Sequence, residues 1–273
     1  MSDLSLLHEL RETAVLAARR AGAVIAANYT KPREVREKRG PRDLVTDTDH
    51  AAQAVVLETI SERHPDHFIL AEENPLERPN SQGVWPIRDG VVWTVDPLDG
   101  TTNFTTGIPM FCTAVGAAID GEPVAGAIYD PMRDEMIVAA RGLGATLNGK
   151  PLPPLGQVRL RHSTVSLDWS RGKLTRQQVV RFVDDLARAC RTLRALGSAA
   201  LALGYVGLGR VQVYLNFGLQ PWDTGAAAAI IREVGGELWR IDGTPWVFGE
   251  PGLIAGHPSV LEEVVRVAEH AGQ

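Results

Sequence analysis

The feature that most constrains this chain is the stretch 93–104, where two acids and a glycine-threonine turn follow an apolar strand. The apolar run that leads into it consists of Val91, Val92, Trp93 and Val95. Such β-branched and aromatic residues favour a buried strand, and we expect Pro97 to end it. Asp96 and Asp99 would then lie together at its mouth, where two carboxylates so close to each other require a cation.

The turn behind the two acids has the residues of an anion site. Gly100 leaves room for a ligand beside the backbone, while Thr101 and Thr102 bring hydroxyl and N–H groups to a helix start. Asp-Pro and Asp-Gly are also ordinary turn signals, so a purely structural turn is the alternative. The strand, the paired acids and the Gly-Thr-Thr run together favour a metal-dependent phosphate site. All the donors are oxygens, including the Leu98 carbonyl, which suits Mg²⁺ rather than zinc.

This stretch resembles the signature Asp-Pro-Ile/Leu-Asp-Gly-Thr-Thr-Asn-Phe of the inositol monophosphatase family, part of the lithium-sensitive, Mg²⁺-dependent sugar phosphatase superfamily. Three further blocks match the family in its own order: residues 43–49, 71–73 and 222–227, the last leading to Gly235 and Gly236. Four ordered blocks make the resemblance very specific for the family. They are much less specific for the substrate.

The resemblance implies a layered αβαβα sandwich with its active site where two halves of the chain meet. The residue pattern itself favours an α+β part over 1–152, carrying most metal ligands, and an α/β part over 153–273, carrying the substrate contacts and Asp223. The expected elements are helices over 4–29, 48–64, 224–234 and 260–270, a strand over 68–71, and hairpins within 111–154.

Several acids have a structural alternative to metal binding. Neighbours on an extended chain point opposite ways, so only one of Glu72 and Glu73 is expected to face a metal, and the other to be solvated or to support it. The resemblance selects Glu72. Asp223 could be only the N-cap of its helix, and Asp49 could only stabilise a helix start, but the family pattern gives both a functional role.

Hydrolysis of a phosphate monoester is the chemistry that these residues imply. One Mg²⁺ would be held by Glu72, Asp96 and the Leu98 carbonyl, where it would lower the pKa of a bound water. A second Mg²⁺, held by Asp96, Asp99 and Asp223, would stabilise the departing alkoxide.

The expected catalytic residues are Thr101, Asp49 and Glu72. Thr101, polarised by Asp49, would orient and deprotonate the attacking water. The N–H groups of Gly100 and Thr101 would hold the phosphoryl oxygens, with Thr102 as a further substrate contact. The resemblance alone implies a third, weaker Mg²⁺ near Glu72 and Asp49.

For the substrate, Ser198 and Ala199 match a family segment whose backbone and hydroxyl groups meet the sugar or polyol, although Ser198 would serve equally well as a helix N-cap. Lys38 has the position of the family's mobile-loop lysine, in a basic run over 31–42 that is either a solvated loop or steers a dianion. Asn216 departs from the family. A Glu is typical there and accepts hydrogen bonds from polyol hydroxyls, whereas Asn is uncharged and also donates.

Composition agrees with a soluble enzyme. The 273 residues are 44% hydrophobic and carry a net charge of −5, which gives no general attraction for nucleic acid or acidic membranes. Cys112 and Cys190 have no paired spacing, so we expect buried, reduced thiols in a cytoplasmic protein. The N-terminus lacks the pattern of a signal peptide, and no apolar run is long enough to cross a bilayer. The resemblance implies a homodimer.

The sequence therefore predicts a Mg²⁺-dependent phosphomonoesterase whose first candidate substrate is inositol 1-phosphate. Histidinol phosphate, fructose 1,6-bisphosphate and a nucleotide 3′-phosphate are alternatives within the family. A relative that binds a phosphorylated metabolite or a protein partner without catalysis is the alternative from another class. The complete set of carboxylates together with Thr101 favours catalysis.

Overall fold

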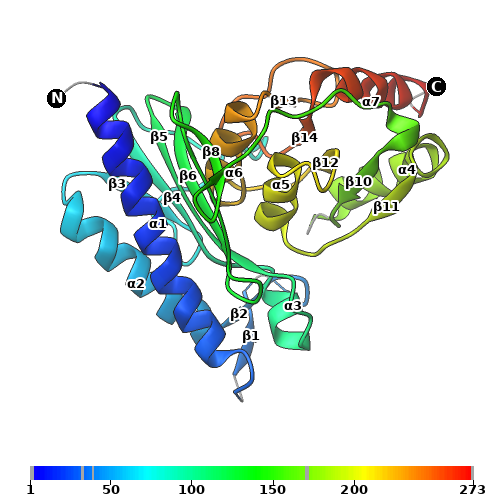
Figure 1. Ribbon diagram of the computed structural model, residues 1–273. Coiled ribbons are helices and arrows are strands. Elements are labelled where there is room, and N and C mark those ends of the chain that lie inside the picture. Colours follow the sequence, from blue (N-terminus) through cyan, green and yellow to red (C-terminus); the bar gives the residue numbers. More distant parts are fainter. Residues whose placement is uncertain (1–2, 32–33, 39, 170–171, 272–273) are drawn as a thin grey trace.

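Layers of helices and sheets alternate through the fold, a computed structural model that describes residues 3–31, 34–38, 40–169 and 172–271 (Figure 1). The helices are α1 (Asp3–Asn28), α2 (Asp47–Arg63), α3 (Thr101–Thr106), α4 (Lys173–Ala189), α5 (Ala199–Gly207), α6 (Pro221–Glu233) and α7 (Pro258–Ala271), with a 3₁₀ turn at Leu160–His162. α1 and α2 cover one sheet, α5 and α6 lie between the two large sheets, and α4 and α7 cover the second. This order confirms the predicted αβαβα sandwich.

The first large sheet has seven strands in the order β3-β4-β5-β6-β7-β8-β9. Their bounds are β3 (Phe68–Ala71), β4 (Val91–Asp99), β5 (Cys112–Ile119), β6 (Glu122–Asp130), β7 (Glu135–Ala140), β8 (Gly144–Leu147) and β9 (Lys150–Pro151). β3 and β4 are parallel, and the other neighbours are antiparallel, as expected of consecutive hairpins.

The second large sheet has five strands in the order β11-β10-β12-β14-β13. They are β10 (Thr164–Leu167), β11 (Thr192–Arg194), β12 (Val213–Asn216), β13 (Glu237–Trp239) and β14 (Leu253–Gly256). A separate small sheet pairs β1 (Val35–Glu37) with β2 (Leu44–Thr46), so part of the predicted basic loop is a short strand. Pro32, Arg33 and Arg39 of that run lie outside the described residues.

Helix α1 covers its sheet with a stripe of small and branched side chains. Leu10, Ala14, Ala17, Ala21 and Ile25 recur at helical spacing and are fully buried. The alanines in this stripe let the helix lie close against β5 and β6. The hydrophobic side chains of the chain's first helix thus form one core with the inner residues of the first sheet.

Helix α6 lies even closer to the opposite face of the same sheet, because glycines stand where it crosses. A Cβ atom at Gly116 of β5 would lie 2.5 Å from the backbone nitrogen of Ala226, and one at Gly126 of β6 would overlap the backbone of the same residue. Gly225 on the helix faces Thr94 of β4 in the same way. This contact fixes the start of α6, and with it Asp223, relative to the end of β4.

One hydrophobic core contains residues of both predicted parts, since α5 and α6 pack on β5, β6 and β7 as well as on the second sheet. A boundary near residue 152 therefore stays a prediction. Cys112 and Cys190 are free and buried, as expected. Among the described residues, no helix is both long and apolar enough to cross a membrane.

Candidate metal and phosphate site

Three of the predicted metal ligands converge where β4 ends and α6 begins. Asp96, Asp99 and Asp223 each offer a carboxylate oxygen, and these oxygens all lie within 4.8 Å of one another. Asp96 and Asp99 are buried, whereas Asp223 is partly exposed. The three acids thus form the shared cluster that the sequence predicted for the second metal.

A bulge in β4 brings Asp96 and Asp99 to the same face. The expectation that Pro97 ends the strand was wrong, because β4 continues to Asp99. Its pairing with β5 passes from Asp96 opposite Ala114 to Asp99 opposite Cys112, so β4 has one extra residue there. Residues three apart on a regular strand point to opposite faces, and the extra residue restores the same face. Pro97 fits in the bulge because its missing N–H is not needed for pairing.

Asp223 is held by the first turn of its own helix. The helix begins at Pro221, three residues before the predicted start, because proline favours the first helical position. Asp223 is therefore not the N-cap. Its Oδ2 atom accepts the backbone N–H of Gln220, the actual N-cap residue, at 2.7 Å. This capping box fixes the orientation of the carboxylate toward the cluster.

The electrostatics of the cluster fit a hard divalent cation. Burial, followed by the charges of Glu72, Asp99 and Asp223, raises the pKa of Asp96 well above its ordinary value. Burial also raises the pKa of Asp99, although hydrogen bonds from Ser198 and the backbone oppose the shift. A bound cation would favour the ionised forms of such buried, mutually repelling acids, and an all-oxygen donor set suits Mg²⁺.

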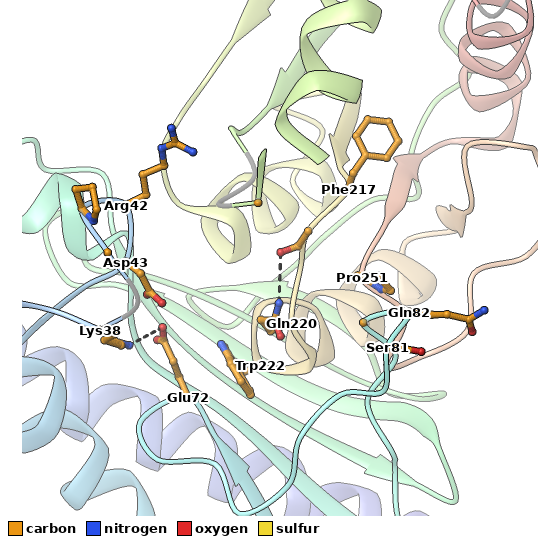
Figure 2. Close-up of a pocket in the computed structure, with 15 residues that line it drawn as sticks. Lys38, Arg42, Asp43, Glu72, Ser81, Gln82, Phe217, Gln220, Trp222 and Pro251 are labelled. Atoms are coloured by element: carbon orange, nitrogen blue, oxygen red, sulfur yellow. Dashed lines mark hydrogen bonds and ion pairs between the residues drawn. The ribbon is translucent and has the colours of Figure 1, made fainter. Parts of the chain in front are cut away.

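Glu72 and Glu73 both contact Lys38, and Figure 2 shows the contact with Glu72. The Lys38 Nζ atom lies 3.0 Å from Glu72 Oε1 and 2.5 Å from Glu73 Oε1. Burial lowers the pKa of Lys38, but the charges of both glutamates outweigh it, so the net shift is upward. Burial and the charge of Glu72 raise the pKa of Glu73 to about 7.

The two glutamates do not separate as an extended chain would require. Glu73 is only 5% exposed, so the solvated alternative was wrong. Its backbone is fixed by the Gln53 amide of α2, which donates to the Glu73 carbonyl at 2.8 Å and accepts its N–H at 2.9 Å. The charge of Glu72 is the largest of the charges that raise the pKa of Asp96, which agrees with Glu72 as a close neighbour of the cluster.

Thr101 and Asp49 form a direct pair, although they are 52 residues apart. The Thr101 hydroxyl lies 2.9 Å from Asp49 Oδ1 and 3.1 Å from the Leu98 carbonyl oxygen. Asp49 Oδ2 accepts the backbone N–H of Thr46 at 2.8 Å, which makes Asp49 part of the capping box of α2. Burial raises the pKa of Asp49, so its carboxylate holds a proton more readily than an exposed one.

The turn between these groups has a left-handed backbone at Gly100, with φ of 95°. A side chain there would be strained, and its Cβ would lie 3.0 Å from the carbonyl oxygen of Met110. The short helix α3 begins at the next residue, so Gly100, Thr101 and Thr102 line the same wall of a cavity.

Ser198 is the N-cap residue of α5, as predicted, but its side chain makes no capping hydrogen bond. Its hydroxyl donates instead to Asp99 Oδ2 at 2.5 Å. The same carboxylate oxygen accepts the N–H of Ala200 at 2.7 Å, so Asp99 satisfies the start of α5. Ala199 lines the cavity, whereas Ser198 is fully buried behind it.

Asn216 is engaged by its neighbours on β12. Its side-chain amide donates to the Tyr214 hydroxyl at 3.1 Å, and its Oδ1 atom accepts the N–H of Gly218 at 2.9 Å. The Tyr214 hydroxyl lies 3.1 Å from Asp168 Oδ2. Asp168 was not predicted, although it directly follows the apolar strand β10, and an acid after an apolar strand is the same signal that pointed to Asp96.

Two adjoining cavities open at the site. The smaller, of about 470 Å³, is lined by Asp99, Gly100, Thr101, Thr102, Asp168, Ala199, Asn216 and Asp223, with Trp169 and Arg176 on its wall. The larger, of about 680 Å³, includes Lys38 and Glu72 of the predicted site residues, and Trp222 and Gln220 lie opposite them (Figure 2). The smaller cavity has the predicted phosphate and alcohol contacts and is the better candidate for the substrate.

Comparisons with known proteins agree with this geometry. The sequence profile of the inositol monophosphatase family matches residues 6–273. Nus factor SuhB of Escherichia coli K12 is 36% identical over 269 residues, which cover 95% of this chain and 95% of the relative. The inositol-1-monophosphatase of Synechocystis sp. is 36% identical over 265 residues, covering 96% and 88% of the two chains. The structure of the inositol monophosphatase from Anabaena superposes with a TM-score of 0.82 at 32% identity, covering 97% of this chain and 96% of that one.

Proposed function

Since this chain belongs to the inositol monophosphatase family, we propose that it is a Mg²⁺-dependent phosphomonoesterase acting on a small phosphorylated polyol or sugar, with inositol 1-phosphate as the first candidate. One observation carries the proposal. The Thr101–Asp49 pair and the cluster of Asp96, Asp99 and Asp223 belong to a single site, with Thr101, Asp99 and Asp223 on the wall of one cavity.

The donor set suggests two metal positions. Glu72, Asp96 and the Leu98 carbonyl would hold one Mg²⁺, and Asp96, Asp99 and Asp223 would hold a second. When bound, Mg²⁺ supplies the positive charge that offsets these acids, lowers the pKa of water and stabilises a departing alkoxide. We propose that each chain binds two or three Mg²⁺ ions.

The chain's own groups handle the proton of the attacking water. The Thr101 hydroxyl donates to Asp49, so its oxygen can accept a hydrogen bond from water in line with the phosphate. The raised pKa of Asp49 makes this carboxylate a better acceptor for the proton that Thr101 passes on. The backbone N–H groups of Gly100 and Thr101 bind phosphoryl oxygens at the start of α3.

A second candidate function is binding without catalysis. It is favoured by the name of the Escherichia coli relative, Nus factor SuhB, which is not an enzyme's name. The presence of Thr101 and of every predicted carboxylate ligand supports catalysis, because a protein freed from hydrolysis has no chemical need to retain the whole set.

Phosphate release over a panel of substrates tests the proposal. The panel contains inositol 1-phosphate, histidinol phosphate, fructose 1,6-bisphosphate and adenosine 3′,5′-bisphosphate, each with Mg²⁺ and with EDTA. We expect release only with Mg²⁺, and a preference within the panel that identifies the alcohol. Absence of release from every compound, by a folded protein that binds Mg²⁺, would refute catalysis in favour of the binding function.

A further inference from the structure

We propose that Asp168 is a specificity-determining residue that binds hydroxyl groups on the alcohol part of the substrate, an inference that rests on the proposed phosphatase function. Asp168 directly follows β10 and lines the same cavity as Asp99, Thr101 and Asp223. Phosphate contacts and an additional carboxylate therefore share one cavity of about 470 Å³, a size suited to a small phosphorylated alcohol.

Asp168 is held in place by two donors. Its Oδ1 atom accepts the N–H of Gly197 at 2.7 Å, and its Oδ2 atom accepts the Tyr214 hydroxyl at 3.1 Å. Gly197 has a left-handed backbone, with φ of 75°, and Tyr214 is fully buried. One donor directly precedes the N-cap residue of α5 and the other lies in β12, so hydrogen bonds from two elements orient the carboxylate in the cavity wall.

The carboxylate has acceptor capacity beyond these two bonds. An ionised carboxyl group accepts about four hydrogen bonds, and the described residues provide two to Asp168. Among those residues, no lysine or arginine forms an ion pair with it. Burial raises its pKa to about 7, so the ionised form that accepts these bonds predominates above that pH. A ligand hydroxyl in the cavity would donate to the remaining acceptor positions.

The hydrogen-bond directions give Asp168, rather than Asn216, the role of acceptor. The Asn216 amide donates to the Tyr214 oxygen, so the single phenolic proton of Tyr214 is directed to Asp168. The Asn216 Oδ1 atom is in turn bonded to the N–H of Gly218. Asn216 thus positions the Tyr214 hydroxyl, and the carboxylate that ends this chain of hydrogen bonds as its acceptor is Asp168.

Two phosphates that differ in their alcohol part test this assignment. Inositol 1-phosphate has free hydroxyl groups, whereas p-nitrophenyl phosphate has no hydrogen-bond donor on its leaving group. The variant is Asp168→Asn, which retains the size of the side chain. The matched control is Asp184→Asn, which removes an exposed acid paired with Arg188 on the outer helix α4.

We expect Asp168→Asn to lower kcat/KM for inositol 1-phosphate by about 10- to 100-fold, mainly through KM, as for the loss of charge-assisted hydrogen bonds. Hydrolysis of p-nitrophenyl phosphate should stay within about 3-fold of wild type, and Asp184→Asn should change neither substrate. Equal losses on both phosphates, or no loss on either, would overturn the assignment.

Failure of the proposed function would be visible in the wild type. A wild-type protein that hydrolyses neither phosphate with Mg²⁺ refutes the phosphatase activity itself. In that case the role of Asp168 is tested by calorimetry, which measures the affinity of the wild type and of Asp168→Asn for inositol 1-phosphate in Mg²⁺. Binding about 10-fold weaker in Asp168→Asn would support its role in recognition. Equal binding by the two proteins would refute it.

Discussion

Replacing Asp96 with Asn should stabilise the metal-free protein while abolishing its activity. Asp96 is only 2% exposed and shares its surroundings with Asp99, Asp223 and Glu72. Asparagine has the same shape and can still accept the N–H of Leu98, which Asp96 Oδ1 accepts at 3.1 Å. The substitution therefore removes one charge from the cluster without creating a cavity or leaving that N–H unpaired.

The size of the effect follows from the spacing of the acids. Two charges 4.8 Å apart repel by about 3.5 kcal/mol at an effective dielectric constant of about 20. Asp96 has two such neighbours, and protonation of one acid relieves much of the repulsion. We therefore expect a net stabilisation of about 2 kcal/mol in EDTA, or a rise in Tm of about 4–8 °C for a chain of this size.

The effect should depend on pH in a defined direction. The folded pKa of Asp96 is raised, so the folded chain retains this proton at pH values where the unfolded chain has lost it. Stability of the metal-free wild type therefore falls as pH rises above the ordinary aspartate pKa of about 3.9. The advantage of Asp96→Asn should be small in acid and largest near neutral pH and above.

Thermal unfolding in EDTA and in Mg²⁺, over a range of pH, measures these effects. Mg²⁺ at 100 times its Kd should stabilise the wild type by about 2.7 kcal/mol and raise its Tm. The same Mg²⁺ concentration should raise the Tm of Asp96→Asn much less. The control is Asp130→Asn. Asp130 is a buried acid outside the cluster that pairs with Arg133 at 2.7 Å, so its replacement should make the protein less stable. A metal-free Asp96→Asn protein less stable than wild type at neutral pH would refute the reasoning.

Three further predictions address catalysis, ion selectivity and packing. Thr101→Ala should lower kcat by about 10²-fold with little change in KM, because its hydroxyl acts on the attacking water, and Thr101→Ser should retain most activity; a change in KM alone would make Thr101 a binding residue. Li⁺ should inhibit phosphate release at concentrations where Na⁺ does not, by occupying the second metal position, and equal insensitivity to both salts would count against the roles of Asp99 and Asp223. Gly126→Ala should destabilise the fold by about 2 kcal/mol or more, because the new methyl group overlaps Ala226 of α6. Gly156→Ala is the control, because a Cβ atom there meets no neighbour within 4 Å and should not destabilise the fold. Equal Tm values for the two variants would contradict this packing argument.

The three clustered acids could be predicted from the sequence because each belongs to a short local pattern. An acid pair after a valine-rich strand pointed to Asp96 and Asp99, and the resemblance of residues 222–227 to the family pattern pointed to Asp223. The order of helices and strands followed in the same way from periodicity and turn residues. Each of these patterns is set by residues that are close together along the chain.

The features that were missed depend on contacts between distant segments. The bulge in β4 needs β5 as its partner, and the contact of Lys38 with Glu72 and Glu73 joins residues more than 30 positions apart. Asp168 is an intermediate case. Its position after β10 was a visible signal, but its place beside Tyr214 becomes evident only when β10 pairs with β12.

Three acids of the site also accept backbone N–H groups at the starts of three helices. The same sequence pattern therefore predicts both a helix cap and a metal site. Asp49 accepts an N–H at the start of α2, Asp99 at the start of α5 and Asp223 at the start of α6. Each helix start has a partial positive charge, and a nearby carboxylate gains about 0.3–1 kcal/mol from it. The three helix starts thus offset part of the repulsion among the acids before any cation binds. Capping uses one oxygen of Asp49 and leaves the other for Thr101, so the structural role orients the side chain for the functional one.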